Sequence, residues 1–199
     1  MNKEKSALLL VNVGTPDNPS VNAVRRYLFQ FLNDPRVIDL PWLARKILVN
    51  LIIVPFRAPK SAKLYKRLWT KEGSPLLINS LKLKDKLQSK LNGEADVFIA
   101  MRYGEPSIKK TIESIRTGGY KNVIILPMFP QYASSTTGTA IQAVFKEMEN
   151  WNTIPFVHTI SKFYDHPAFL EAFTQRIATY KPQDYDYVLF SYHGLPNNH

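Results

Sequence analysis

Residues 7–13 have the sequence ALLLVNV, a continuous apolar run that ends in the turn sequence GTPDNP. Such a run is typical of a parallel strand that is buried on both faces of its sheet. Four later segments have a similar apolar character, with helix-like segments between them. These expected strands comprise residues 95–103, 122–130, 154–160 and 186–192. Strands that alternate with helices predict an α/β fold with a doubly wound, mainly parallel sheet of the Rossmann-like or flavodoxin-like kind.

The expected helices are marked by caps and by apolar spacing. Ser20 and Ser107 are suitable N-cap residues, and Gly118 is a stop signal for the helix that begins at Ser107. Val21, Val24 and later apolar residues recur at helical spacing in the first helix. The expected helices comprise residues 20–34, 107–119, 138–150 and 168–180.

The composition bounds the class of protein. The chain has 199 residues, 45% hydrophobic content, no cysteine and a formal net charge of +10. The length allows one or two domains, and the lack of cysteine excludes disulfides and cysteine-ligated metal sites within this chain. The charge indicates an anionic partner, unless it only reflects the protein surface. The first residues show no cleavage site, so we expect a strand rather than a signal peptide, and a cytoplasmic protein.

Polar and aromatic side chains follow the expected strands at their carboxyl ends. They are Arg102, Tyr103, Tyr132, the hydroxyl run Ser134–Thr137, and His193. Ligands of open parallel sheets bind at this edge, which therefore predicts a binding site. Two members have structural alternatives, because Arg102 could pair with a structural carboxylate and the hydroxyl run could simply cap the helix that follows it.

His193 is the leading candidate for chemistry. It lies one residue beyond the expected strand at 186–192 and precedes Gly-Leu-Pro. An imidazole has an ordinary pKa of about 6.5, which suits proton transfer at neutral pH or metal ligation. The alternative is a histidine without a chemical role, which is the interpretation favoured for His158 and His166.

Residues 40–71 form a distinctive apolar and basic segment. Its first part, LPWLARKILVNLIIVPF, has only two charges, and its second part, residues 57–71, has six basic residues and no acid. The segment is too interrupted for a confident membrane span but suits peripheral contact with a membrane surface. It could equally flank a flat apolar ligand that bears carboxylates, or form a buried helical excursion between strands. Nucleic acid is not an expected partner, because no nucleic-acid-binding module is recognisable.

Five segments together resemble the ferrochelatases, which insert ferrous iron into a porphyrin at the end of haem synthesis. They are LLLVNVGTP (8–16), EGSPL (72–76), AMRYGEPSI (100–108), PMFPQYASSTTGTA (127–140) and FSYHGLP (190–196). The segments occur in the family's order and cover essentially the whole chain. The combination of the SSTTG and SYHGLP segments is specific, whereas GTP or RYG alone would not be.

The resemblance implies two similar Rossmann-like domains that face a cleft. Residues 1–180 would then form the first chelatase domain, with residues 40–71 as an insertion at the lip of the cleft. Residues 181–199 would form a strand and turn that carry His193 and begin the connection to a second domain. That second domain, expected but absent from this chain, would supply a catalytic glutamate. The 199-residue chain is therefore expected to be inactive alone.

The resemblance also implies the reaction. Fe²⁺ would enter protoporphyrin IX to give haem b with release of two protons, so that iron is a substrate and no cofactor is permanently bound. His193 is implied as catalytic residue and metal ligand, and Arg102 and Tyr103 as groups that deliver metal or contact porphyrin. The hydroxyls of Ser135, Thr136 and Thr137 would approach the porphyrin propionates. The remaining expected substrate contacts are Val13, where other members carry tyrosine or an aliphatic residue, and Tyr132.

Ser134 stands where some ferrochelatases place a cluster-binding cysteine, so no iron–sulfur cluster is expected on this chain. Three alternative functions stay open. One is a non-catalytic module that binds a tetrapyrrole or another anion at a membrane surface. Another is a chelatase for cobalt or nickel with a more carboxylated tetrapyrrole. A Ser/His hydrolase is disfavoured, because the chain has no G-x-S-x-G sequence.

Overall fold

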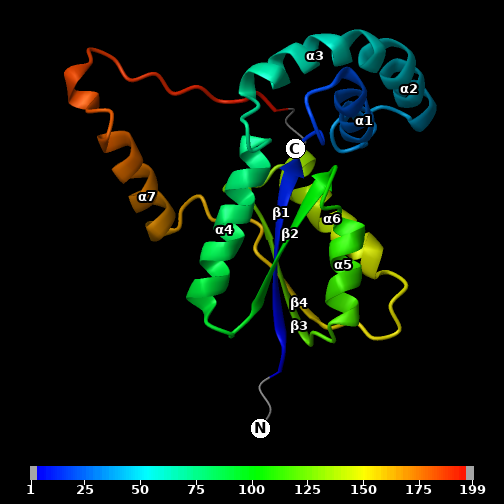
Figure 1. The fold of residues 1–199 in the computed structure, drawn as a ribbon, viewed down its shortest axis with the longest axis vertical. Coiled ribbons are helices and arrows are strands. Elements are labelled where there is room, and N and C mark those ends of the chain that lie inside the picture. Colours follow the sequence, from blue (N-terminus) through cyan, green and yellow to red (C-terminus); the bar gives the residue numbers. More distant parts are fainter. Residues whose placement is uncertain (1–3, 196–199) are drawn as a thin grey trace.

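The computed structural model describes residues 4–195 and has a four-stranded sheet at its centre (Figure 1). The strands are β1 (Ser6–Gly14), β2 (Asp96–Tyr103), β3 (Asn122–Pro127) and β4 (Phe156–Thr159). Their order in the sheet is β2-β1-β3-β4, and every pair of neighbours is parallel. The prediction of a parallel α/β sheet is therefore confirmed, with β1 in an interior position.

Helices and shorter helical segments connect the strands and cover both faces of the sheet. They are α1 (Val21–Leu32), α2 (Trp42–Ile47), η1 (Leu48–Ile53), α3 (Val54–Leu68), α4 (Pro75–Leu91), α5 (Ile108–Thr117), η2 (Ser134–Gly138), α6 (Thr139–Met148), α7 (Pro167–Ala178) and η3 (Pro182–Asp184). The expected caps are present, because the hydroxyls of Ser20 and Ser107 accept hydrogen bonds from the backbone N–H groups of Ala23 and Lys110.

The continuous apolar run of β1 is explained by burial on both faces. Leu9 and Val11 face one core with α5 and α6, whereas Leu10 faces a second core with leucines of α4. Alternate residues of a strand point to opposite faces, so a strand covered by helices on both sides needs apolar residues at every position. These two cores fix the carboxyl ends of β1, β2 and β3 at one edge of the sheet.

Helix α4 is not among the helices that the sequence pattern predicts. Its central stretch, LKLKDKL at residues 81–87, alternates leucine and lysine except at Asp85, a pattern that favours neither a clear helical stripe nor a buried strand. In the structure Leu83 and Leu87 nevertheless lie on one side of the helix and pack against β2 and its neighbours. Tertiary packing has therefore overridden an ambiguous local pattern.

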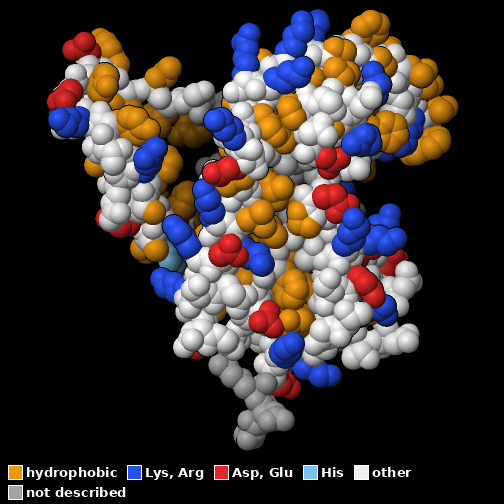
Figure 2. All heavy atoms as spheres, viewed as in Figure 1, with side chains coloured by type: hydrophobic (Ala, Val, Ile, Leu, Met, Phe, Trp, Pro, Cys, Tyr) orange, Lys and Arg blue, Asp and Glu red, His pale blue; other side chains and the backbone are white. Residues whose placement is uncertain are grey.

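Residues 42–68 form a continuous helical arch of α2, η1 and α3 above the sheet (Figure 1). One side of the arch is buried against α1 through Val49, Val54 and Ala58. The other side exposes large apolar side chains, and Figure 2 shows them gathered at the α2 end, with lysines and arginines along α3. Those at this end are Trp42, Leu43, Ile47, Leu51, Ile52 and Phe56, and Leu64 and Leu68 are exposed farther along α3. The interpretation of this segment as a wholly buried excursion is therefore wrong.

The fifth strand expected at residues 186–192 is not formed. Residues 187–195 have no regular structure and pair with no strand, and Tyr187 and Leu189 are each 92% exposed. The preceding helix α7 has the expected position, yet it has no buried residue and stands apart from the sheet in Figure 1. A strand is stabilised by hydrogen bonds to a neighbour, and within residues 4–195 this segment has none. The expected strand at 154–160 is likewise reduced to the four residues of β4.

No helix within residues 4–195 combines the length and the apolar character needed to cross a lipid bilayer.

Candidate functional site

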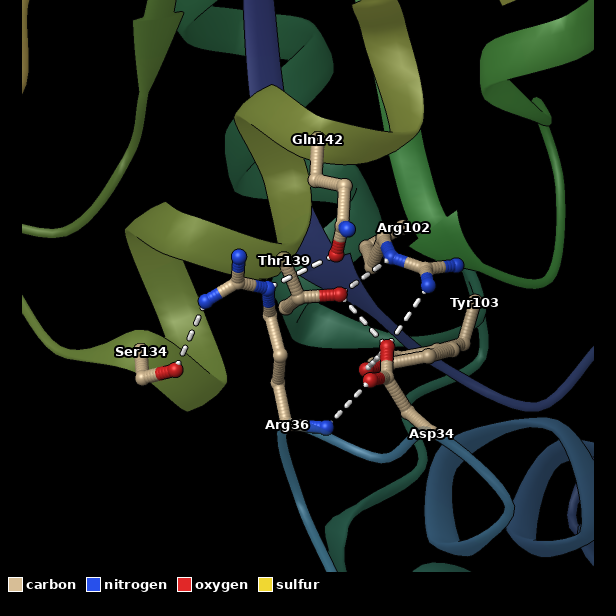
Figure 3. A network of polar contacts seen from close by, with 7 residues as sticks. All are labelled: Asp34, Arg36, Arg102, Tyr103, Ser134, Thr139 and Gln142. Carbon is tan, nitrogen blue, oxygen red and sulfur yellow. Dashed lines mark hydrogen bonds and ion pairs between the residues drawn. The ribbon is translucent and has the colours of Figure 1, made fainter. Parts of the chain in front are cut away.

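The carboxyl ends of the strands place several predicted site residues close together. Arg102 and Tyr103 end β2, and the SSTTG segment forms η2, a short π-helical turn between β3 and α6. Figure 3 shows that Arg102, Tyr103 and Thr139, the first residue of α6, all point toward one carboxylate, that of Asp34. The expected convergence of polar groups at this edge is therefore present for these segments.

The Asp34 carboxylate is the centre of the network. Its Oδ2 atom accepts hydrogen bonds from Arg102 Nη2 at 2.6 Å, from the Tyr103 hydroxyl at 2.8 Å and from the Thr139 hydroxyl. Its Oδ1 atom accepts the backbone N–H of Arg36 at 2.8 Å. Both carboxylate oxygens are thus satisfied, although the side chain is only 2% exposed.

This environment sets the protonation state of Asp34. Burial alone would raise the pKa of the carboxyl group, because it disfavours the charged form. The hydrogen bonds from Thr139, Arg36 and Tyr103, together with the charge of Arg102, outweigh burial and lower the pKa below its ordinary value. Asp34 is therefore ionised at neutral pH and balances the charge of Arg102.

The lowered pKa predicts an acid-dependent loss of stability. A carboxyl group with a lower pKa in the folded state stabilises the fold above its unfolded pKa, near 3.8, and this contribution is lost as the pH falls through the folded pKa. We expect the difference in unfolding free energy between the wild type and Asp34→Asn to be largest at neutral pH and to shrink below pH 3.8. Denaturant unfolding of the complete protein at a series of pH values measures this, and a difference that is constant down to acid pH would contradict it.

Tyr103 is part of the core rather than of an open surface. Its side chain is 1% exposed, and its ring lies edge-on to Phe31 and Tyr27 at centroid distances of 5.2 and 6.5 Å. Burial raises the pKa of the Tyr103 phenol, and the nearby Asp34 charge raises it further. The hydroxyl therefore stays protonated at neutral pH and serves Asp34 as a hydrogen-bond donor.

Arg102 is the member of the network that reaches open space. Its Nε donates to the Thr139 hydroxyl at 2.7 Å, and its guanidinium carbon lies 4.6 Å from the centre of the Tyr103 ring. The side chain is 27% exposed and lines two hollows. One is a cavity of about 270 Å³ beside Thr15 and Gln30, and the other is a groove of about 1020 Å³ along α6.

Arg36 connects the loop after α1 to the SSTTG turn. Its Nη1 donates to the Ser134 hydroxyl at 2.9 Å and its Nε donates to the Gln142 side-chain oxygen at 2.7 Å (Figure 3). Neither Asp34 nor Arg36 was singled out in the sequence. An arginine in an apolar strand, Arg102, indicates that a carboxylate partner is needed. It does not indicate which acidic residue is that partner.

The hydroxyl run itself is mostly turned inward. The Thr136 hydroxyl donates to the carbonyl oxygen of Ala133 at 3.3 Å, and Ser135 is half-buried. Thr137 is fully buried, and its hydroxyl has no hydrogen-bond partner within the described residues. Tyr132, in contrast, is 52% exposed and lines the groove along α6. Contact of this run with a substrate stays a prediction.

Val13 lies near the end of β1 and is half-buried against the core formed by α1 and the helical arch. Its aliphatic side chain offers no oxygen or nitrogen to a metal ion. Any role of Val13 at a site is therefore limited to apolar contact.

His193 is exposed and lies in the segment without regular structure. Its Nδ1 atom lies 2.8 Å from the carbonyl oxygen of Gly194, and this contact is a hydrogen bond in the tautomer that carries its proton on Nδ1. In the neutral ring Nε2 then keeps a free lone pair. The structure does not bring His193 into the Asp34 network, and no group of three potential metal ligands occurs within residues 4–195. The role of His193 stays a prediction.

Comparison with known proteins gives the family context. A sequence model of the family described as Ferrochelatase matches residues 5–199. A Coxiella burnetii (strain CbuG_Q212) protein named ferrochelatase is 44% identical over an alignment that covers 100% of this chain and 55% of that relative. A Legionella pneumophila (strain Paris) protein of the same name is 45% identical, with 98% of this chain and 58% of the relative covered. The chain thus spans little more than half the length of these curated relatives.

Proposed function

Because the chain belongs to the ferrochelatase family, we propose that it forms part of an enzyme that inserts Fe²⁺ into protoporphyrin IX and releases two protons. The observation that carries this proposal is the meeting of two family segments at one sheet edge. Arg102 of AMRYGEPSI is hydrogen-bonded to Thr139, which directly follows SSTTG. The groove beside them, about 1020 Å³, has the size of a small-molecule site.

The proposed chemistry suits an imidazole. Metallation removes two protons from pyrrole nitrogens and replaces water on Fe²⁺, and a neutral imidazole nitrogen can accept a proton or bind a borderline metal. In the tautomer whose Nδ1–H donates to the Gly194 carbonyl, the Nε2 atom of His193 is this basic nitrogen. We propose His193 as base, metal ligand or both, with an opposing carboxylate from a second domain. In this scheme iron is a substrate, and no resident cofactor is required.

The carboxylates of the proposed substrate have candidate partners at the same edge. Protoporphyrin carries two propionates, and Arg102 presents a partly exposed guanidinium beside the groove. An arginine is suited to a carboxylate because its planar fork of N–H groups matches the two oxygens. We propose that Arg102 and Tyr132, together with the turn containing Ser135, contact the porphyrin, with Val13 as an apolar contact.

The experiment that tests the function is a metallation assay on the complete protein. Purified protein is mixed anaerobically with protoporphyrin IX and Fe²⁺, and haem formation is followed by its absorbance. We expect turnover with iron and protoporphyrin. The rate should fall when a more carboxylated tetrapyrrole replaces protoporphyrin, because the apolar side chains of the helical arch favour the less charged substrate. Faster insertion of cobalt or nickel into the more carboxylated compound would instead favour the related chelatase function. Porphyrin binding without any turnover would favour a binding module.

A second proposal concerns the helical arch at residues 42–68, which we propose makes peripheral contact with a membrane. It exposes a cluster of apolar side chains, among them Leu51 and Phe56, at 68% and 72%. The last part of the arch, helix α3, and the residues after it carry the six basic side chains of residues 57–71 with no acid. Apolar side chains beside a basic helix match the interface of an anionic bilayer.

Membrane contact predicts a specific loss on substitution. Replacing both Leu51 and Phe56 by Asp removes apolar burial worth about 1.5–3 kcal/mol per side chain, so vesicle binding should fall at least about tenfold. Co-sedimentation of the complete protein with phosphatidylserine-containing vesicles measures it, and binding should also weaken with added salt. Leu81→Asp, on the exposed part of α4, is the matched control and should bind normally. Equal binding by the double variant would contradict the proposal.

A further inference from the structure

Asp34 joins three parts of the chain at the edge where Arg102 emerges. It lies two residues beyond α1, while its partners belong to β2 and to the first turn of α6. A single oxygen, Oδ2, receives three donors, from Arg102, Tyr103 and Thr139. Since each donor comes with its own direction, the carboxylate fixes the relative placement of these side chains.

The geometry restrains the Arg102 guanidinium in one orientation. Nη2 is bonded to Asp34 at 2.6 Å and Nε is bonded to Thr139 at 2.7 Å. The Thr139 hydroxyl closes the ring of contacts, because it accepts from Arg102 while donating to Asp34. In Figure 3 the third nitrogen of the guanidinium points away from this network, and within residues 4–195 it has no hydrogen-bond partner.

We propose that Asp34 is a positioning residue that aims the free edge of the Arg102 guanidinium at a carboxylate of the substrate. The inference rests on the proposed function, in which Arg102 contacts the porphyrin. Asp34 lies at the wall of the groove, but its side chain is only 2% exposed and both its carboxylate oxygens are occupied by protein donors, so it acts through Arg102. Thr139 assists, because its hydroxyl accepts a hydrogen bond from the Nε atom of Arg102 and so holds the guanidinium at a second point.

An amide cannot replace the Asp34 carboxylate without conflict. In Asp34→Asn, an NH₂ group at the Oδ2 position would face three donors, and in the flipped orientation it would face the Arg36 N–H. Either arrangement leaves a buried donor without an acceptor and frees the guanidinium from its charged anchor. The substitution therefore changes the aim of Arg102 while keeping the size of the side chain.

The test uses the complete protein with two metal-free probes, protoporphyrin IX and its dimethyl ester, whose binding is measured by fluorescence quenching. We expect Asp34→Asn to raise the Kd of the free acid by roughly tenfold or more, since one charge-assisted contact is lost, and to leave the Kd of the ester unchanged. In an Arg102→Gln background, Asp34→Asn should have no further effect.

A second pair of variants keeps the test valid if Asp34→Asn does not fold. Thr139→Val removes the hydroxyl at nearly constant shape and should weaken binding of the free acid, whereas Thr139→Ser should restore it. Asp96→Asn is the matched control, because Asp96 accepts a hydrogen bond from the Tyr120 hydroxyl at 2.6 Å but lies at the start of β2, the opposite end of that strand. Its Kd for both probes should equal that of the wild type.

Two results would overturn the inference while leaving the proposed function intact. One is an equal loss of affinity for acid and ester in Asp34→Asn, and the other is a full Asp34→Asn effect in the Arg102→Gln background. Either would show that Asp34 only holds the fold together. If the wild type binds neither probe, the proposed function fails first and the inference fails with it.

Discussion

The complete protein carrying His193→Ala is expected to insert Fe²⁺ about 10²–10⁴-fold more slowly than the wild type while still binding porphyrin. The reason is that alanine has no group to accept a pyrrole proton or to bind the metal. Because the proposed role of His193 is in proton transfer and metal binding, the loss should fall on the chemical step. The rate of haem formation and the quenching of porphyrin fluorescence separate the two quantities.

The matched control for this experiment is His158→Ala. His158 is also an exposed histidine, but it lies within β4, an edge strand of the sheet. Turnover of His158→Ala should be close to that of the wild type. Near-normal turnover of His193→Ala would remove the catalytic assignment, and a loss of porphyrin binding in that variant would point to a structural role instead.

Gly14→Ala is expected to lower the unfolding free energy of the complete protein by about 3 kcal/mol or more. Gly14 ends β1 with φ +106°, a conformation that L side chains rarely adopt, and it lies opposite Tyr103 in the sheet register. A Cβ atom there would lie 1.8 Å from the Tyr103 carbonyl oxygen. Backbone atoms cannot move aside as a flexible side chain would, so β1 and β2 would have to separate at the site.

A second glycine separates the effect of the positive φ from that of the Cβ contact with the backbone. Gly93 also has a positive φ, +81°, but an added Cβ would meet nothing within 4 Å. Gly93→Ala should therefore cost only the conformational strain, about 1–2 kcal/mol. Denaturant unfolding of both variants measures the difference. Equal destabilisation would mean that the close approach of β1 and β2 does not restrict position 14.

Much of the sheet could be predicted because burial leaves a local mark. ALLLVNV is apolar at nearly every position because helices cover both faces of β1. Each residue of such a strand faces one of the two cores, so the local sequence alone shows the pattern. The segment at 186–192 carries a similar pattern but forms no strand. Its composition shows that it is suited to pairing, whereas a strand also needs a neighbour, and that neighbour is a property of the whole fold.

For each interaction in the site, the sequence predicted one of the two residues but not its partner. Arg102 in an apolar strand indicated a carboxylate partner or a ligand, and the partner proves to be Asp34. The sequence contains 16 acidic residues, and the one chosen lies 68 positions away. Nothing local distinguishes Asp34 from the others, because its selection depends on how α1 and its following loop pack over the end of β2. The same holds for Tyr103, whose burial depends on the aromatic cluster with Phe31.

The interior position of β1 has a consequence for the folding of the chain during its synthesis. On the ribosome β1 is made before its partners β2 (Asp96–Tyr103) and β3 (Asn122–Pro127), which emerge much later. At about 5–20 residues per second, its apolar run waits several seconds without either neighbour. During that interval ALLLV is an unpaired, exposed apolar segment that is prone to aggregation, and chaperones bind segments of this kind. The segment that organises the finished sheet is therefore also the one most in need of protection while the chain is being synthesised.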